Sequence, residues 1–346
     1  MAKAQPASAE LGWPTGDQPG DLNFQYKPSQ AAQDTILSAL SRVFPPAHSP
    51  HAALHALTPP EGVAGRYRLT TPEGAWFVRV SMWLGNAALE KLLVDYLASR
   101  NAPVNPLLVA GVTLEWTGRV YRVDVRPLIR GRHFNGSLDD LAQMAQTLAA
   151  CHTALVRFPH AQDIFAAAAQ RVQRLSGARD RIDEAVQTGD YHMFAEQGSW
   201  AVQHRQWLAQ MVERFQPDTH QLPQAQCLHG QVHPGNVLFA EGGTAVLLDW
   251  EEAVYNYAPP AFDLAYFVQR SCHRDNPSHE ILRQRLDTIA AHYGPLPPLA
   301  EMMRQQAWMS MAAIVNFQLQ GIATPLSEYD KFVRLEQQAR ALIGIV

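Results

Sequence analysis

Hydrophobic residues follow two different periods along the chain, one of two residues and one of three to four. In residues 65–128, Tyr67 and Leu69 alternate with polar residues in "RYRLTT", and "AWFVRV" and "VYRVDVRPL" are also typical of strands, so these segments predict β-strands. The "PEG" between the first two segments predicts a turn. We therefore expect a β-hairpin followed by further strands.

The helical period governs residues 30–44 and 86–100, and it returns over most of the chain after residue 137. Ser29 and Ser137 precede two of these segments as candidate N-caps, and a pair of prolines stops the first. The pattern predicts an α+β protein with a small antiparallel-sheet part and a larger helical part. We place an irregular arm at 1–28, the sheet part at 29–127 and the helical part at 128–346.

One stretch of the helical part breaks the helical period. Residues 227–239 are "CLHGQVHPGNVLF" and residues 245–254 are "AVLLDWEEAV". We interpret this stretch as a loop followed by two short strands.

The composition is typical of a well-packed protein and does not predict binding to nucleic acid or to a membrane. Apolar residues make up 47% and charged residues 17% of the 346 residues, a balance typical of a domain with a core. The formal net charge of −4 predicts neither a nucleic-acid surface nor attraction to a membrane. No apolar run is long enough to span a bilayer, and the first thirty residues lack the apolar core of a signal peptide. With three scattered cysteines and no disulfide pattern, we expect a cytoplasmic protein.

The candidate chemistry lies in the stretch that breaks the helical period. Phosphoryl transfer from ATP mainly requires positioning and neutralisation of phosphate charge, and kinase loops supply a base, a metal-binding asparagine and a later metal-binding aspartate. Here His229 opens the loop, Asn236 stands at the asparagine position, and Asp249 follows the apolar strand. Amide and carboxylate oxygens suit Mg²⁺, so Asn236 and Asp249 are the candidate metal ligands.

These motifs resemble the aminoglycoside phosphotransferase and choline kinase family of small-molecule kinases. The family shows "HGDxHxxN", "DWE" and "DLA", and this chain has "HGQVHPGN", "DWE" and "DLA" in the same order. Upstream, Arg79 occupies the position of the phosphate-gripping Lys or Arg, and Glu90 matches the helix glutamate. The resemblance extends over roughly residues 34–320 and is specific because the motifs occur together.

The resemblance implies a two-lobed, protein-kinase-like fold that binds ATP and Mg²⁺ and phosphorylates a hydroxyl of a small metabolite. It also implies an ion pair between Arg79 and Glu90, a structural role for Asp263 in bracing the catalytic loop, and a nucleotide-binding glycine turn containing Gly62 and Gly65. The acceptor stays unnamed, because the family builds its acceptor pocket from variable helices, and the sequence carries no signal of oligomeric state.

Gln231 departs from the family, which has its catalytic aspartate at this position. A glutamine amide does not accept a proton at neutral pH, although it hydrogen-bonds a hydroxyl and orients it. We therefore expect slow transfer, with Gln231, His229 and His233 as the catalytic candidates and His233 as a possible substitute base. The alternative is a pseudokinase that binds nucleotide or metabolite without turnover.

Several residues keep a second interpretation. His229 and His233 fit a zinc pair only on a helix, which the Pro-Gly that follows them opposes. Arg79 alone fits a solvent-facing strand position, and Glu90 alone fits a solvated helix face. Four aromatic residues fit either core packing or a pocket for a cationic, amine-bearing acceptor: Trp250, Tyr255, Trp308 and Phe317.

Overall fold

The structure, a computed structural model, is an α+β protein that divides into two compact units. The predicted fold class is therefore confirmed. The sheet unit contains the described residues up to His160 and also Pro234–Val254, and the helical unit contains Ala161–His233 and the described residues from Tyr255 onward. The described residues are 24–82, 84–216, 218–273, 277–321 and 324–342.

These units do not coincide with the boundaries expected from the sequence. The arm at 1–28 lies outside the described residues as far as residue 23. The segment Pro234–Val254 packs with the sheet although it follows the first half of the helical unit along the chain. The predicted boundary between residues 127 and 128 separates the two lobes of the expected kinase-like fold. The two compact units are a different division of the chain, so this boundary stays a prediction.

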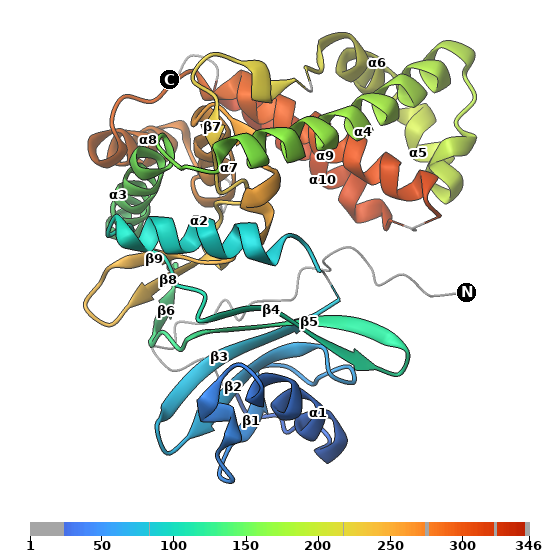
Figure 1. Cartoon of the computed structure of the whole chain (residues 1–346). Coiled ribbons are helices and arrows are strands. Elements are labelled where there is room, and N and C mark those ends of the chain that lie inside the picture. The colour runs from blue at the N-terminus through green and yellow to red at the C-terminus, as the bar shows by residue number, and fades with distance from the viewer. Residues whose placement is uncertain (1–23, 83, 217, 274–276, 322–323, 343–346) are drawn as a thin grey trace. The chain divides into compact units, whose positions relative to one another are not determined.

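A five-stranded antiparallel sheet is the framework of the sheet unit (Figure 1). Its strand order is β1-β2-β3-β5-β4, so β3 lies in the middle with β2 and β5 beside it. The predicted hairpin is confirmed as β2 and β3, which join at the pair Thr71 and Gly74. The strands are β1 (Ala53–Ala56), β2 (Gly65–Thr71), β3 (Gly74–Ser81), β4 (Val109–Trp116) and β5 (Arg119–Pro127).

The two faces of this sheet differ in polarity because successive side chains on a strand point to opposite sides. Val78 and Val123 lie in the apolar core that also contains residues of helix α1 (Gln30–Ser41). Arg79 and Asp124 follow them along the chain, stand opposite each other across β3 and β5, and so lie on the other face. One sheet thus has a core face and a charged face.

Helix α1 begins where the sequence predicts and ends three residues early. The Ser29 hydroxyl accepts a hydrogen bond from the amide of Ala32 at 3.2 Å and caps the first turn. The helix stops at Ser41, ahead of the two prolines, and Pro45–His48 form a short 3₁₀ helix, η1. Proline disfavours helical backbone in the residue before it, and Phe44 before Pro45 is accordingly extended, with φ −132° and ψ 94°.

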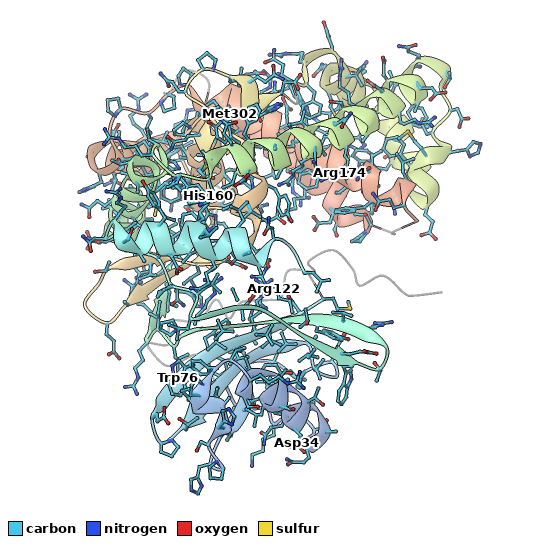
Figure 2. The ribbon with its side chains drawn as sticks, in the orientation of Figure 1. Asp34, Trp76, Arg122, His160, Arg174 and Met302 are labelled. Carbon is cyan, nitrogen blue, oxygen red and sulfur yellow. The ribbon has the colours of Figure 1, made fainter. Side chains whose placement is uncertain are left out.

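Helix α2 (Ala87–Ser99) is tied to the charged face through Glu90, whose partner Arg122 is labelled in Figure 2. Glu90 is 1% exposed, and its carboxylate accepts hydrogen bonds from Arg122 and, at 2.7 Å, from Arg126. The Nε of Arg122 lies 2.8 Å from a carboxylate oxygen of Asp124. Four buried charged groups therefore neutralise one another between β5 and α2.

The ion pair implied between Arg79 and Glu90 is wrong for this structure. The "RVDVR" alternation of β5 places Arg122 and Arg126 on the same face as Asp124. These two arginines bond both carboxylate oxygens of Glu90, and Arg79 pairs with other carboxylates. Glu90 acts here as a link between helix and sheet.

A smaller sheet of three strands completes the sheet unit and contains the two short strands predicted after the loop. Helix α3 (Leu138–Leu155) packs on it, and the Thr147 hydroxyl donates a hydrogen bond to the carbonyl of Ala245 at 2.7 Å. Ser137 caps α3 as predicted, by accepting from the amide of Asp140. The strands, in spatial order, are β6 (Gly131–His133), β8 (Val237–Ala240) and β9 (Ala245–Leu247).

The helical unit consists mainly of helices (Figure 1) and contains a large buried apolar cluster. Phe194, Trp200 and Trp308 are buried together in that core. Two short paired strands, β7 (Gln226–Cys227) and β10 (Tyr257–Ala258), lie beside the loop that begins at His229. The helices are α4 (Ala161–Thr188), α5 (Gly198–Gln203), α6 (Arg205–Arg214), α7 (Ala261–Ser271), α8 (His279–Tyr293), α9 (Leu299–Leu319) and α10 (Leu326–Ala341), with short 3₁₀ segments η2 (His192–Gln197) and η3 (Thr219–Gln221).

Among the helices of the described residues, none combines the length and the apolar character that crossing a membrane requires.

Replacing Glu90 with alanine is predicted to destabilise the protein strongly. The change leaves Arg122 and Arg126 buried without their main counter-charge, which typically costs about 3–5 kcal/mol. Urea denaturation measures the free energy of unfolding, and the control is Lys91→Ala, whose side chain is 39% exposed. A loss for Glu90→Ala no larger than that of the control contradicts the structural role of Glu90.

Candidate functional site

The loop His229–His233, which we call the HGQ loop, is held by a buried carboxylate of the same unit. Asp263 lies in the first turn of α7 and is 0% exposed. Its two oxygens accept hydrogen bonds from the amide of His229 at 2.9 Å and from the amide of Gly230 at 2.7 Å. The bracing role that the resemblance implied for Asp263 is therefore confirmed.

Gly230 is required in this loop by its backbone and by its surroundings. Its φ is +85°, a conformation that residues with a Cβ rarely adopt. A Cβ added to it would lie 2.2 Å from the side-chain nitrogen Nδ2 of Asn256. The next amide, that of Gln231, donates to Nδ1 of His229 at 3.1 Å. The backbone that presents Gln231 is thus fixed on several sides.

The three catalytic candidates differ in exposure. His229 is completely buried, and its ring serves as an acceptor within the loop. Gln231 and His233 are half-buried. The ring of His233 lies 6.2 Å, centroid to centroid, from that of Tyr266 on α7. These positions favour Gln231 for contact with a substrate and a packing role for His229, while the catalytic roles stay predictions.

The two candidate metal ligands lie at the ends of two adjacent strands of the sheet unit, Asn236 just before β8 and Asp249 two residues after β9. Asn236 ends the 3₁₀ turn η4 (Pro234–Asn236) and is 7% exposed, and its carbonyl accepts from the amide of Leu248 at 2.8 Å. The pair Val237 and Leu247 fixes the register of β8 and β9. In this register Asn236 stands opposite Leu248, the residue immediately before Asp249.

Asp249 has an uncommon backbone conformation. Its φ is +60°, in the left-handed region that aspartate and asparagine tolerate better than most residues. It stands between β9 and the 3₁₀ segment η5 (Trp250–Tyr255). Backbone strain of this kind is common at functional sites.

Arg79 pairs with two carboxylates, and we call this group the Arg79 cluster. Its guanidinium lies 2.6 Å from an oxygen of Asp249 and 2.7 Å from an oxygen of Glu251. The three side chains are only 18–28% exposed, so water screens their charges weakly. Arg79 comes from the middle of β3, and the two carboxylates come from the segment after β9.

The pKa values of the cluster reflect burial and the mutual charges. Burial alone lowers the pKa of Arg79, but Asp249 and Glu251 outweigh it and hold that pKa above its ordinary value. Burial raises the pKa of Glu251 to about 7, although Arg79 opposes the shift. Burial and the charge of Arg79 lower the pKa of Arg66, which stands opposite Arg79 on β2. The cluster is therefore a closely coupled group of charges on the charged face of the sheet.

The two glycines predicted to cover the nucleotide lie in the connection between β1 and β2. Gly62 has a φ of +65°, and a Cβ added to it would lie 2.9 Å from the indole nitrogen of Trp116. Gly65 is the first residue of β2. The left-handed backbone of Gly62 favours glycine, whereas that of Gly65 is not left-handed, and contact of either residue with a nucleotide stays a prediction.

The described residues contain no group of three or more His, Cys, Asp and Glu side chains placed to hold a metal ion. Mg²⁺ ordinarily takes one or two protein carboxylates together with phosphate oxygens of a substrate. The donors at Asn236 and Asp249, an amide oxygen and a carboxylate, fit that kind of site.

Sequence reasoning missed several residues of this region. The "RVDVR" alternation already indicates that Arg122 and Arg126 share a face with Asp124, so the partners of Glu90 were accessible from the pattern. The pairing of Glu251 with Arg79 had no such signal, since the two residues are 172 positions apart. The same is true of Asn256, which packs on Gly230.

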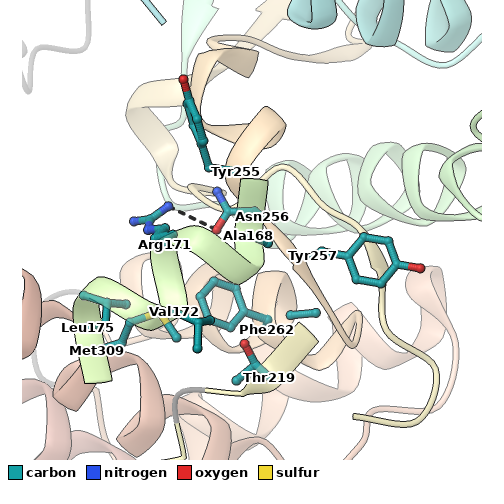
Figure 3. Close-up of a pocket in the computed structure, with 11 residues that line it drawn as sticks. Ala168, Arg171, Val172, Leu175, Thr219, Tyr255, Asn256, Tyr257, Phe262 and Met309 are labelled. Atoms are coloured by element: carbon teal, nitrogen blue, oxygen red, sulfur yellow. Dashed lines mark hydrogen bonds between the residues drawn. The ribbon is translucent and has the colours of Figure 1, made fainter. Parts of the chain in front are cut away.

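The four aromatic residues with two interpretations divide between core and surface. Trp250 and Trp308 are buried to 0% and 1% exposure, so their packing role is clear. Phe317 is 40% exposed. Tyr255 lines a hollow in the helical unit (Figure 3).

Three solved structures resemble this chain in fold. The match to the ethanolamine kinase of Plasmodium vivax has a TM-score of 0.57 and 10% sequence identity. It covers 89% of this chain and 86% of the kinase chain. The match to a spectinomycin phosphotransferase in complex with ADP and spectinomycin has a TM-score of 0.55 and 14% sequence identity. It covers 82% of this chain and 89% of the phosphotransferase chain. The match to an amicoumacin kinase in complex with AMP-PNP and Ca²⁺ has a TM-score of 0.52 and 11% sequence identity. It covers 85% of this chain and 89% of the kinase chain. These similarities confirm the protein-kinase-like fold.

No curated protein sequence matches the chain. A family model described as "Phosphotransferase enzyme family" matches residues 55–300, which is well over half of the chain and includes the Arg79 cluster and the HGQ loop. The chain therefore belongs to the phosphotransferase enzyme family.

Proposed function

We propose that this protein transfers the γ-phosphoryl group of ATP to a hydroxyl of a small metabolite, with Mg²⁺ bound at Asn236 and Asp249. In the reaction a bond forms between the acceptor oxygen and the γ-phosphorus, and the bond from that phosphorus to the oxygen of ADP breaks. The products are ADP and a phosphate monoester, and the hydroxyl proton ends in water. We also place the protein in the cytoplasm, where the buried thiols of Cys151, Cys227 and Cys272 stay reduced.

The observation that carries this proposal is the register of β8 and β9. The backbone amide of Leu248 donates a hydrogen bond to the backbone carbonyl of Asn236. This bond fixes Asn236 beside the end of β9, which Asp249 follows. Mg²⁺, when bound there with ATP, supplies neutralisation of phosphate charge. The residues at this strand end have the oxygen donors that such an ion needs.

Arg79 is proposed to bind phosphate. A guanidinium forms paired, charge-assisted hydrogen bonds with anionic oxygens, and Arg79 already forms such bonds with Asp249 and Glu251. A nucleotide triphosphate presents the same kind of oxygens. The side chain therefore has the charge and the position, in the middle of the sheet, for a phosphate contact beside the proposed metal ligands.

The HGQ loop is proposed to orient the acceptor hydroxyl through Gln231. Asp263 and Asn256 fix the backbone on either side of Gly230, so the glutamine starts from a rigid loop. Its amide orients a hydroxyl without taking the proton, and the loose transition state of phosphoryl transfer depends more on placement than on early deprotonation.

A second candidate function is binding of nucleotide or metabolite without transfer. Gln231 is the observation that favours it, because the residue lacks a titratable oxygen at the position of the family's aspartate. Under this alternative the metal and phosphate residues keep their binding roles.

The variant Gln231→Asp is predicted to raise turnover. A carboxylate at this position adds general-base assistance, which is worth on the order of 10²–10⁴ in rate. ADP formation is measured with ATP, Mg²⁺ and a panel of amino alcohols, sugars, hydroxy acids and aminoglycosides, for the wild type and the variant. The matched control is Gln221→Asp, in the 3₁₀ segment η3 of the same unit, which is expected to leave turnover unchanged.

Two outcomes of this assay decide between the candidates. Acceptor-dependent ADP formation by the wild type supports the transferase, and a rise confined to Gln231→Asp shows that the missing carboxylate limits the rate. ATP binding without ADP formation in either protein supports the pseudokinase and contradicts the transferase.

Removing the charge of Arg79 is predicted to weaken ATP binding. Losing charge-assisted hydrogen bonds of about 1.5–3 kcal/mol corresponds to a roughly 10- to 100-fold higher Kd. Isothermal titration with ATP and Mg²⁺ compares Arg79→Met, Arg79→Lys and the control Arg119→Met, which removes an exposed arginine from β5 of the same sheet. We expect Arg79→Lys to bind more tightly than Arg79→Met, and an unchanged Kd in Arg79→Met contradicts the phosphate contact.

A further inference from the structure

The two carboxylates of the Arg79 cluster contact different nitrogens of the guanidinium. Nη1 of Arg79 donates to Asp249 at 2.6 Å, and Nη2 donates to Glu251 at 2.7 Å. A guanidinium carries its donors in a fixed planar fork, so it can lose the bond on one nitrogen and keep the bond on the other. This geometry allows Asp249 and Glu251 to have different roles toward Arg79.

Asp249 has two competing cations in the proposed function, because it is also the proposed metal ligand. A divalent cation and a guanidinium beside one carboxylate repel each other, and the doubly charged ion competes more strongly for it. We therefore expect the bond between Arg79 and Asp249 to weaken when metal and nucleotide bind. Glu251 is then the partner that continues to hold Arg79, and Nη1 turns to a phosphate oxygen.

The helix glutamate Glu90 is already engaged by other arginines. In protein kinases a glutamate of this helix pairs with the phosphate-gripping basic residue. Here Oε1 of Glu90 accepts from Arg126 and Oε2 accepts from Arg122. Both arginines are buried and need this counter-charge. Arg79 instead pairs with a glutamate from another part of the chain.

Glu251 is suited to hold Arg79 because its own segment is fixed. It lies in the first turn of η5, directly after Trp250, which is 0% exposed. The indole nitrogen of Trp250 donates to the carbonyl of Leu247 at 3.1 Å and ties η5 to the end of β9. The side chain of Glu251 is 18% exposed, so water screens its bond with Arg79 only weakly. The carboxylate is thus presented to the middle of β3 from a rigid support.

A second arginine makes this support more important. Arg66 stands opposite Arg79 across β2 and β3, so the two side chains lie on the same face of the sheet. Two like charges at this spacing repel each other. Burial and the charge of Arg79 lower the pKa of Arg66, and the charges of Asp249 and Glu251 oppose that shift. Glu251 therefore offsets a repulsion that would otherwise push Arg79 away from its position.

We propose that Glu251 is the positioning residue of Arg79 and takes the role that the helix glutamate has in protein kinases. It holds Nη2 of Arg79 while Nη1 exchanges Asp249 for a phosphate oxygen of the nucleotide. The inference rests on the proposed function and adds a residue to its phosphate-binding site. Glu251 acts through Arg79 and contacts neither the phosphate nor the metal ion.

The direction in which ATP affinity changes tests this role. Glu251→Gln keeps the shape of the side chain and removes its charge, and it is expected to raise the Kd of ATP about five- to tenfold because Arg79 loses its partner. A carboxylate that only stood near the phosphates would repel them, so its removal would lower the Kd. Glu251→Asp keeps the charge and is expected to raise the Kd less than Glu251→Gln.

Isothermal titration with ATP and Mg²⁺ measures these Kd values on the full chain. The matched control is Glu241→Gln, at an exposed glutamate between β8 and β9 of the same unit, which is expected to bind ATP like the wild type. Thermal unfolding checks that each variant folds. If Glu251→Gln does not fold, the same comparisons are made with Glu251→Asp.

Two further titrations separate a positioning role from other roles. In the Arg79→Met background, the change Glu251→Gln is expected to give no increase in the Kd, because no guanidinium is left to position. With EDTA in place of Mg²⁺, the increase caused by Glu251→Gln alone is expected to persist, because the contact between Arg79 and phosphate does not require the metal ion.

Three results would overturn the proposal. They are an unchanged or lower Kd in Glu251→Gln, an increase of the same size in the Arg79→Met background, and an increase that disappears in EDTA, which would place Glu251 at the metal ion. Absence of ATP binding in the wild type would contradict the proposed function itself. ATP binding by the wild type with no effect of Glu251→Gln contradicts the positioning role alone.

Discussion

A single guanidinium, that of Arg79, lies between two carboxylates in the sheet unit and pairs with both. The proposed site depends on these two ion pairs. Arg79 reaches Asp249 and Glu251 from the middle of β3, in a position where water screens charge only partly. Two neighbouring carboxylates repel each other, and a cation between them removes that cost. The same carboxylate that Arg79 holds, Asp249, is the one proposed to bind a metal ion, so phosphate, metal and arginine share one small set of charges.

The sheet makes this arrangement possible by separating its two faces. Its core face packs against α1, and its charged face carries Arg79, Asp124 and the arginines that hold Glu90. The charged face thereby contains two neighbouring ion-pair groups, and the charge of Asp124 in one of them helps to raise the pKa of Arg79 in the other. One anchors α2 through buried charges, and the other holds the partly exposed carboxylates of Asp249 and Glu251 after the end of β9.

Much of the fold could be predicted from the sequence because it follows from local patterns. Alternation and a turn motif identified the hairpin, strand-like composition identified β5, helical spacing identified α1, α2 and α3, and Ser29 and Ser137 marked two helix starts. The "FDLA" motif indicated Asp263 as the brace of the loop. The partner of Glu90 was predicted wrongly, because the family pattern was carried over without following the alternation of β5.

Other contacts had no local signal. Arg79 meets Glu251 across 172 positions, and Asn256 meets Gly230 through a turn whose shape the letters do not encode. The hollow around Arg171 depends on the packing of α4, α7 and α9, which no motif describes. Sequence patterns indicate which residue types are available, and tertiary packing decides which of them meet.

Electron paramagnetic resonance of Mn²⁺ with ATP tests the central claim most directly, because Mn²⁺ substitutes for Mg²⁺ and reports its own ligands. The account predicts a protein-bound Mn²⁺ signal in the wild type whose oxygen environment changes in Asn236→Ala and whose intensity falls sharply in Asp249→Asn. Identical spectra and intensities in all three proteins would contradict the assignment of these two residues as metal ligands.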